Sequence, residues 1–184
     1  MEHQITLQQL LIEKCKRGDT QAQHELYKQY VHAMYNVAYR ICGNRYDAED
    51  VLQESFLKAF TKLSSFKGEA SFGSWLKRIV VNQSITAMRS RKGFLSPLTP
   101  AIESNTKEEA DTWIDEDFPM EKVIQAIESL PDGARTVFTL KAIEEYKFSE
   151  ISEMLGLSET NCKVQYHRSK KLLNEKLKVL VAEN

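Results

Sequence analysis

Apolar residues in the first half of the chain recur at the spacing of helices. Intervals of three and four residues run through four segments, near residues 7–15, 22–41, 52–63 and 72–88. Such spacing gathers apolar side chains on one face of an α-helix, whereas a half-buried strand would alternate. Glycines are scarce, and Gly18, Gly43, Gly68 and Gly93 lie beyond the ends of these segments. The pattern predicts a four-helix N-terminal domain over residues 1–92.

A second helical domain is expected after a segment in which apolar residues have no regular spacing. Residues 93–118 contain Pro97 and Pro100 and no sustained apolar spacing, which is typical of a flexible linker. Helical spacing resumes at Pro119, and no segment favours a strand. The expected fold class is therefore all-α, with two small helical domains, 1–92 and 119–184, joined by the linker.

The last third of the chain has the spacing of a helix-turn-helix. Ser149 is expected to cap one helix, Gly156 to end it in the left-handed conformation, and Ser158 to cap the next. The second helix has apolar or small residues on one side: Cys162, Tyr166, Ser169 and Leu173. Its other side carries groups that can contact phosphates and bases: Asn161, Lys163, Gln165, His167, Arg168, Lys170 and Lys171. A helical hairpin with a solvated basic face is the alternative interpretation.

Charge is segregated along the chain although the formal net charge is only -1. Residues 67–92 hold six basic residues and one acidic residue, and residues 158–178 hold six basic and two acidic. The linker between them holds seven carboxylates and one lysine. A nucleic-acid function therefore depends on two local basic segments rather than on the total charge.

The cysteines and the apolar runs indicate a soluble protein of the cytoplasm. Cys15, Cys42 and Cys162 are odd in number and far apart, so they predict neither a disulfide framework nor a CxxC zinc site. Cys162 and His167 are interpreted as a core thiol and a surface histidine rather than a metal pair. No apolar run reaches the length of a membrane helix, and the start of the chain lacks a signal-peptide pattern, so no membrane insertion is expected.

Three motifs, in this order and spacing, resemble extracytoplasmic-function (ECF) sigma factors: DAEDVLQESFLKAF, FKGEASFGSWLKRIVVNQSI and SLPDGARTVFTLKAIEEYKFSEISEMLGLSETNCKVQYHRSKKLL. The similarity covers nearly the whole chain except the linker. It implies that 1–92 is sigma region 2 and 119–184 is sigma region 4. It also implies a factor that is not an enzyme, needs no cofactor, and directs transcription initiation. The implied partners are core RNA polymerase at its clamp and flap, promoter DNA, and an anti-sigma factor as a candidate regulator.

The resemblance implies a polymerase-docking segment within residues 47–60. Its candidate docking residues are Asp47, Asp50, Val51, Leu52, Gln53 and Glu54. Asp47 is expected to be the N-cap, and acidic groups suit the positive start of a helix. Gln53 and Glu54 would offer acceptors to an arginine-rich partner. For Asp47 and Glu49, capping and solvation is the favoured explanation.

The resemblance assigns recognition and melting of the minus-ten element to residues 66–91. Its candidate contacts are Phe66, Lys67, Gly68, Lys77, Arg78, Asn82, Thr86 and Arg89. The loop 64–70 would shape a pocket for a flipped base, Asn82 and Thr86 would face bases, and the basic side chains would bind phosphates. Phe72 and Trp75 lie on the apolar stripe and are expected in the core.

The resemblance assigns the minus-thirty-five element to the helix-turn-helix. The candidate contacts are Ser158, Thr160, Asn161, Lys163, Val164, Gln165, His167, Arg168 and Lys171. Asn161 and Gln165 are expected to contact base edges, and Lys163, Arg168 and Lys171 to contact phosphates. Thr86 stands where an aspartate is common. Thr160, Asn161, Cys162, Val164 and Gln165 stand where Gly, Thr, Val, Ser and Arg are usual, so the preferred promoter sequence is not transferable.

The acidic linker has an implied place in the polymerase, and two other functions are possible for the chain. The resemblance implies that the acidic linker lies in a basic polymerase channel otherwise occupied by RNA. One rival is a repressor or activator that acts without polymerase, and the DAEDVLQE motif argues against it. The other is a metal-dependent enzyme using Asp47, Asp50 and Glu54 with His24 or His32. No histidine lies at a sequence spacing that would place it beside these carboxylates. The sequence also contains neither a catalytic nucleophile paired with a general base nor a glycine-rich phosphate loop.

Overall fold

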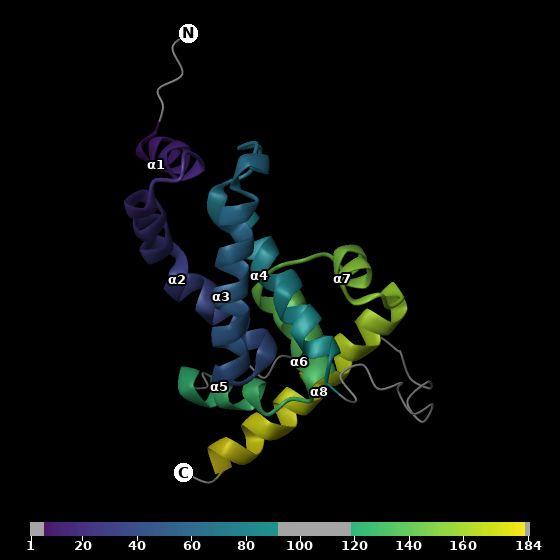
Figure 1. The fold of residues 1–184 in the computed structure, drawn as a ribbon. Helices are drawn as coiled ribbons and strands as arrows, with labels where there is room; N and C mark the ends of the chain where they lie inside the picture. Colours follow the sequence, from purple (N-terminus) through teal and green to yellow (C-terminus); the bar gives the residue numbers. More distant parts are fainter. Residues whose placement is uncertain (1–5, 92–118, 183–184) are drawn as a thin grey trace. The chain divides into compact units, whose positions relative to one another are not determined.

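A computed structural model describes residues 6–91 and 119–182 of the chain (Figure 1). Contacts divide the chain into two compact units, Met1–Ala87 and Met88–Asn184. Within the described ranges every regular element is a helix, so the all-α prediction is confirmed. The predicted linker, 93–118, lies outside the described residues, and the domain limits at 92 and 119 stay predictions.

The first unit is built from the helices that the apolar stripes predict. They are α1 (Leu7–Lys16), α2 (Thr20–Cys42), α3 (Arg45–Thr61), the short 3₁₀ turn η1 (Leu63–Ser65) and α4 (Phe72–Arg89), whose last turn runs past the unit boundary. α2 and α3 lie side by side (Figure 1). Leu26, Ile41 and Leu76 are completely buried, and Phe56 contacts Tyr27 edge-on. Burial of these stripes is the main stabilising term of the unit.

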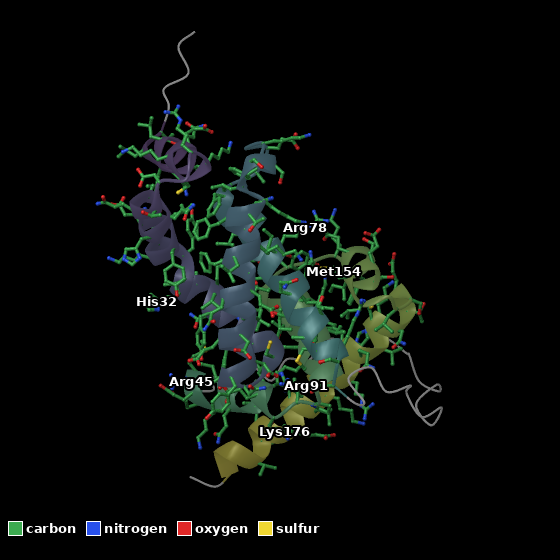
Figure 2. All side chains as sticks on the ribbon, in the orientation of Figure 1. His32, Arg45, Arg78, Arg91, Met154 and Lys176 are labelled. Atoms are coloured by element: carbon green, nitrogen blue, oxygen red, sulfur yellow. The ribbon has the colours of Figure 1, made fainter. Side chains whose placement is uncertain are left out.

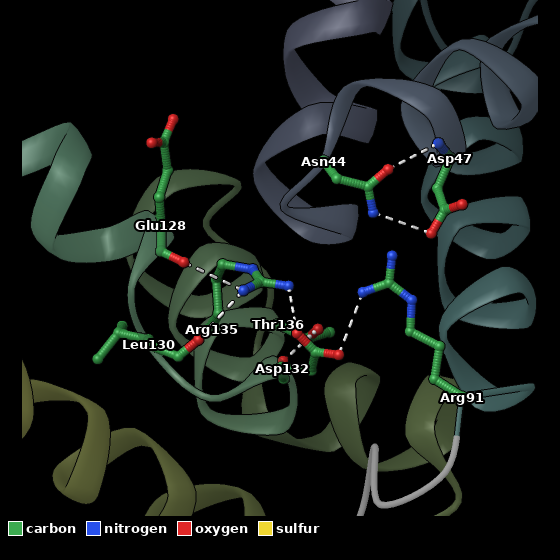
Figure 3. A network of polar contacts seen from close by, with 8 residues as sticks. All are labelled: Asn44, Asp47, Arg91, Glu128, Leu130, Asp132, Arg135 and Thr136. Atoms are coloured by element: carbon green, nitrogen blue, oxygen red, sulfur yellow. Dashed lines mark hydrogen bonds and ion pairs between the residues drawn. The ribbon is translucent and has the colours of Figure 1, made fainter.

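The start of α3 lies earlier than the sequence indicated. Asn44, not Asp47, is the N-cap, because the backbone N–H of Asp47 donates to Asn44 Oδ1 at 2.9 Å. Asn44 Nδ2 in turn donates to Asp47 Oδ2 at 3.0 Å (Figure 3). The prediction that Asp47 caps the helix is therefore wrong. Asp47 lies in the first turn, where its charge still favours the helix dipole.

The second unit surrounds one long helix. Its elements are α5 (Met120–Glu128), α6 (Asp132–Phe138), the π-helical turn η3 (Thr139–Ile143), α7 (Phe148–Leu155) and α8 (Glu159–Ala182). α5, α6 and α7 all pack on α8 (Figure 1). One core cluster contains Ala126, Leu130, Phe138, Leu173 and Leu177. The apolar side of α8 is thus covered from three directions, and its other side faces solvent.

A buried arginine joins α5 to α6. The Arg135 side chain is almost fully buried, and its Nη2 donates to Asp132 Oδ1 at 2.6 Å. Its Nη1 donates to the carbonyl oxygens of Leu130 at 3.1 Å and Glu128 at 3.3 Å (Figure 3). These bonds satisfy the last carbonyl group of α5 and one in the turn that follows, which would otherwise lack partners. No motif or apolar spacing in the sequence indicated this role for Arg135.

The turn between α7 and α8 has the predicted helix-turn-helix geometry. Gly156 has φ 66° and its N–H donates to the carbonyl of Ser152, so the left-handed end of α7 is confirmed. Ser158 Oγ accepts from the N–H of Asn161 at 3.1 Å, which confirms Ser158 as the cap of α8. Ser149 is not a cap. α7 begins at Phe148 with Lys147 as N-cap residue, whose N–H donates to Glu150 Oε2 at 2.8 Å.

None of the described helices combines the length and the apolar character needed to cross a bilayer.

Candidate functional site

A stripe of exposed residues follows the outer face of α3. Tyr46, Asp50, Gln53 and Leu57 succeed one another at intervals of four, three and four residues, and all are exposed. Tyr46 is 80% and Leu57 is 70% exposed, so both are among the most exposed large apolar side chains of the described residues. We call these four residues the α3 stripe. An exposed aromatic and an exposed leucine that flank hydrogen-bonding groups are typical of a protein-binding surface.

Two predicted docking residues lie on the opposite face of α3. Val51 is 2% and Leu52 is 7% exposed, so the prediction that they contact a partner is wrong for this conformation. They pack in the core of the first unit together with Ala48 and Phe56. Their physical contribution is to fix the helix that carries the α3 stripe.

Glu54 is held by Gln83 of α4, a contact that the sequence did not predict. Gln83 Nε2 donates to Glu54 Oε2 at 3.1 Å, and Lys58 Nζ donates to Gln83 Oε1 at 2.9 Å. The amide therefore orients the carboxylate at the edge of the α3 stripe. Glu49 instead pairs with Arg45 at 2.7 Å within the first turn of α3, where Figure 2 labels Arg45. That pairing agrees with the interpretation of Glu49 as a solvated helix residue.

Aromatic packing supports the loop before α4. Phe66 is 9% exposed, with its ring centroid 5.3 Å from that of Trp75 and 5.7 Å from that of Phe72. Phe72 is buried as predicted, and Trp75 is half-buried. The prediction that Phe66 contacts DNA is wrong for this conformation, because its ring lies beneath the loop. Lys67 and Gly68 are exposed on the loop, and Gly68 has φ 76°, a conformation that glycine adopts without strain.

Four of the predicted minus-ten residues form one exposed line on α4. Arg78, Asn82, Thr86 and Arg89 follow at intervals of four, four and three residues, and we call them the α4 stripe. Thr86 Oγ1 donates to the carbonyl of Asn82 at 2.8 Å, so its oxygen is left as an acceptor. Lys77 is half-buried on a neighbouring flank, whereas Arg78 extends from α4 (Figure 2). Two arginines that enclose two small polar side chains suit a strand with phosphates outside and bases between.

The outer face of α8 carries most of the predicted helix-turn-helix residues. Thr160, Val164, His167 and Lys171 follow at intervals of four, three and four residues, and we call them the α8 stripe. All are exposed except Val164, which is half-buried. Lys163 and Arg168 are exposed on its two flanks. A polar and basic helix face of this kind fits the major groove of DNA.

The predicted orientation of Gln165 is wrong. Gln165 is only 7% exposed and shares the inward face of α8 with Cys162 and Ser169. Asn161 is half-buried, and its Oδ1 is shielded and has no hydrogen bond among the described residues. Paired hydrogen bonds from Asn161 to an adenine would therefore require its amide to turn outward.

The described residues do not assemble a metal site. Within residues 6–91 and 119–182 there is no group of three or more His, Cys, Asp or Glu that could hold a metal ion. His24 and His32 are both exposed on α2, and Figure 2 labels His32. Cys162 is completely buried, and this burial raises the pKa of its thiol, as expected for a core cysteine.

Two parts of the chain match known families. Residues 26–94 match sigma-70 region 2 and residues 120–173 match sigma-70 region 4. The first match spans α3 and α4 with both of their stripes, and the second spans the helix-turn-helix. These two matches identify the class of sigma factors.

Whole-chain relatives define the family more closely. The ECF RNA polymerase sigma factor SigW of Bacillus subtilis is 32% identical over 179 residues, covering 92% of this chain and 96% of the relative. The ECF RNA polymerase sigma-E factor of Haemophilus influenzae is 28% identical, covering 98% of this chain and all of the relative. The sigma factor RpoE of Bartonella quintana, solved with the anti-sigma factor NepR, aligns with a TM-score of 0.53 and 20% identity, covering 85% of this chain and 96% of that one. This last likeness concerns the fold alone.

The chain belongs to the ECF family of RNA polymerase sigma factors. It is a transcription initiation factor and not an enzyme. Its function is to bind core RNA polymerase and to direct initiation at specific promoters. The rival interpretations, a regulator that acts without polymerase and a metal-dependent enzyme, do not account for a region 2 match across α3 and α4.

Proposed function

We propose that the α3 stripe, with Glu54 at its edge, is the surface that docks on the clamp of core RNA polymerase. The observation that carries this assignment is the exposure of Tyr46 and Leu57 on either side of Asp50 and Gln53. Aromatic and apolar anchors surrounded by polar groups supply most of the free energy at protein interfaces.

Alanine substitution tests the docking assignment. Combined Gln53→Ala and Glu54→Ala substitutions should weaken binding to core polymerase about thirtyfold, which corresponds to the roughly 2 kcal/mol of a hot spot. The matched control is Glu25→Ala with Gln29→Ala, an exposed pair of the same chemistry on α2. Binding is measured with labelled sigma factor, and circular dichroism checks helicity. Equal affinity of both double variants would show that the docking surface lies elsewhere.

We assign the minus-ten element to the α4 stripe and the loop 64–70. Asn82 and Thr86 contact bases of the unwound non-template strand, while Arg78 and Arg89 bind its phosphates. Lys67 and Gly68 shape the pocket for a flipped base, and Phe66 holds that loop from below. The support for this assignment is the single line of exposed side chains on α4 and the aromatic packing beneath the loop.

We assign the minus-thirty-five element to the α8 stripe. Thr160 and His167 contact base edges in the major groove, and the Val164 side chain contacts a thymine methyl group. Lys163, Arg168 and Lys171 bind phosphates on the groove walls. Ser158 fixes the start of the helix through its bond to Asn161. Gln165 has no part in base contact here, because it is buried.

The second unit also offers a place for the polymerase flap. A groove of about 490 Å³ between α5 and α8 is lined by apolar and polar side chains: Gln125, Ser129, Leu172, Glu175, Lys176 and Val179. Val179 is 58% exposed, and Ile124 on α5 is 49% exposed. We propose that this groove receives an apolar segment of the flap.

The remaining assignments rest on charge and family. We propose that the seven carboxylates of residues 93–118 occupy a basic polymerase channel that RNA later enters. RpoE of Bartonella quintana was solved with the anti-sigma factor NepR, and we propose that a comparable anti-sigma protein restrains this chain. The protein would act in the cytoplasm, where polymerase and DNA are found.

A further inference from the structure

Two aromatic rings and three lysines meet beside the start of α7. Lys141 Nζ lies 5.0 Å and Lys163 Nζ lies 6.0 Å from the ring centroid of Phe148. The Phe148 ring meets that of Tyr166 edge-on at 5.7 Å, and Lys170 Nζ lies 5.7 Å from the Tyr166 centroid. These five residues, from η3, α7 and α8, are called the ring–lysine cluster. Each ammonium group is thus within the distance at which a ring attracts a cation.

The rings restrict lysine side chains that would otherwise move freely. A lysine carries about 2 kcal/mol of rotamer entropy, which it loses when it binds a ligand. Among the described residues, no carboxylate forms an ion pair with Lys141 or Lys163. The contact with Phe148 therefore orders both ammonium groups without neutralising them. Ordered ammonium groups that keep their charge favour the binding of an anion by the cluster.

The position of the cluster in the helix-turn-helix indicates which anion. In this motif the second helix enters the major groove while the first helix crosses the DNA backbone. Phe148 is the first residue of α7, and Lys163 and Lys170 lie on one flank of α8, beside the α8 stripe. The N–H of Lys147 is already bonded to Glu150, so the lysines, more than the helix end, supply the attraction. A backbone phosphate beside the groove fits this geometry.

We propose that Phe148 is a positioning residue that holds Lys141 and Lys163 as a clamp on one phosphate group beside the minus-thirty-five element. The inference rests on the proposed binding of that element by the α8 stripe. Tyr166 extends the clamp to Lys170. Neither Lys141 nor Phe148 reads sequence, so their contribution is the same for every promoter.

The test compares Phe148→Leu with Phe148→Trp in holoenzyme formed with the full chain. Promoter affinity is measured by fluorescence anisotropy at several salt concentrations. Phe148→Leu keeps the apolar volume but removes the ring, and it should weaken promoter binding about threefold. The slope of log affinity against log salt should fall by up to about 0.9, the value for one phosphate contact. Phe148→Trp, which keeps a ring face, should retain wild-type affinity and slope.

Lys141→Ala keeps the experiment decisive if Phe148→Leu unfolds the second unit. It should reproduce the loss of affinity and slope, whereas Lys178→Ala, an exposed lysine of α8 outside the cluster, should not. If Phe148→Leu and Lys141→Ala keep the wild-type salt slope in a holoenzyme that still selects promoters, the clamp is wrong but the proposed function stands. If the two variants lose affinity only for core polymerase, the ring–lysine cluster binds an acidic protein segment instead, and the phosphate clamp is also wrong. Holoenzyme that fails to select promoters even without substitution would overturn the proposed function and the clamp together.

Discussion

The α3 stripe and the α8 stripe are both exposed faces of amphipathic helices, yet they carry opposite chemistry. The α3 stripe exposes Tyr46 and Leu57 around a carboxylate and an amide, whereas the α8 stripe exposes hydroxyl, imidazole and ammonium groups. Apolar anchors favour a partner that excludes water, and dispersed positive charge favours a polyanion surrounded by counterions. Exposure alone therefore does not identify the partner of a helix face. The side chains at the centre and the edges of the stripe do.

The two units also differ in where they place their charges. The first unit has exposed pairs within one helix, such as Arg45 with Glu49, while the second unit buries Arg135 against Asp132. A buried cation whose partner is removed is strongly destabilising, whereas exposed pairs contribute little. The core of the second unit thus includes a polar network centred on the buried Arg135.

Arg135→Ala should give the largest effect on this comparison. It removes the donor to Asp132 Oδ1 and to two carbonyl groups, while Arg91 still donates to Asp132 Oδ2 at 3.2 Å. We expect a loss of about 3 kcal/mol in the unfolding free energy of the second unit. Arg45→Ala removes an exposed pair and should leave the urea unfolding curve unchanged. Hydrogen exchange would show the loss in α5 and α6 but not in α2 and α3. Equal protection in both variants would mean that the network adds nothing to stability.

Leu57→Ala and Arg168→Ala should separate the two stripes by their response to salt. Removing the apolar anchor should weaken core polymerase binding about thirtyfold, near 2 kcal/mol, at every salt concentration. Removing the arginine should weaken all promoters alike and lower the salt slope by about 0.9. The measurement is holoenzyme assembly and promoter binding for each variant between low and high salt. A salt-dependent Leu57 effect would contradict the division into apolar and electrostatic surfaces.

His167→Ala and Gln165→Ala test which side of α8 faces bases. Loss of His167 should change the preferred minus-thirty-five sequence, by about 1 to 3 kcal/mol at one base pair. Loss of the buried Gln165 should lower stability by about 1 kcal/mol and leave sequence preference unchanged. A promoter library scored with both variants decides between them. If only Gln165→Ala shifts the preference, α8 turns its other face to DNA in the complex.

Glu145→Gly should give the smallest effect, a gain in stability. Glu145 has φ 62°, the only positive φ of a non-glycine residue among the described residues. Side chains other than glycine are strained there, so glycine should stabilise the second unit by about 0.5 kcal/mol. The control is Glu144→Gly, because Glu144 has a right-handed conformation and should lose stability instead. Thermal melting of the two variants in opposite directions is the expected result.

The sequence predicted the helices more accurately than the details at their ends. Apolar spacing locates α2 and α4 because burial itself produces that spacing. The segment from Asn44 to Asp47 offers two residues able to cap α3, and apolar spacing does not distinguish them. Ser149 likewise suits a cap by residue type, but the N-cap residue of α7 is Lys147, two residues earlier.

The candidate surfaces were predicted in part. The α4 stripe follows from the residues the family resemblance indicated, since Arg78, Asn82 and Thr86 keep a four-residue interval. The burial of Gln165 had a signal in the sequence, because it lies three residues after Cys162 and four before Ser169. The hydrogen bond from Gln83 to Glu54 had no such signal in the sequence. It depends on how α3 and α4 pack, which no local spacing specifies.

The separation of the two sides of α8 has a consequence for the divergence of promoter preference. Cys162, Gln165 and Ser169 hold the helix to its domain, while Thr160, Val164 and His167 lie outside that packing. Substitutions on the outer positions can therefore accumulate without loss of folding stability, so a duplicated gene could acquire a new set of target promoters in a few steps. The same separation makes the outer positions of α8 the natural place to engineer a sigma factor that ignores the promoters of its host.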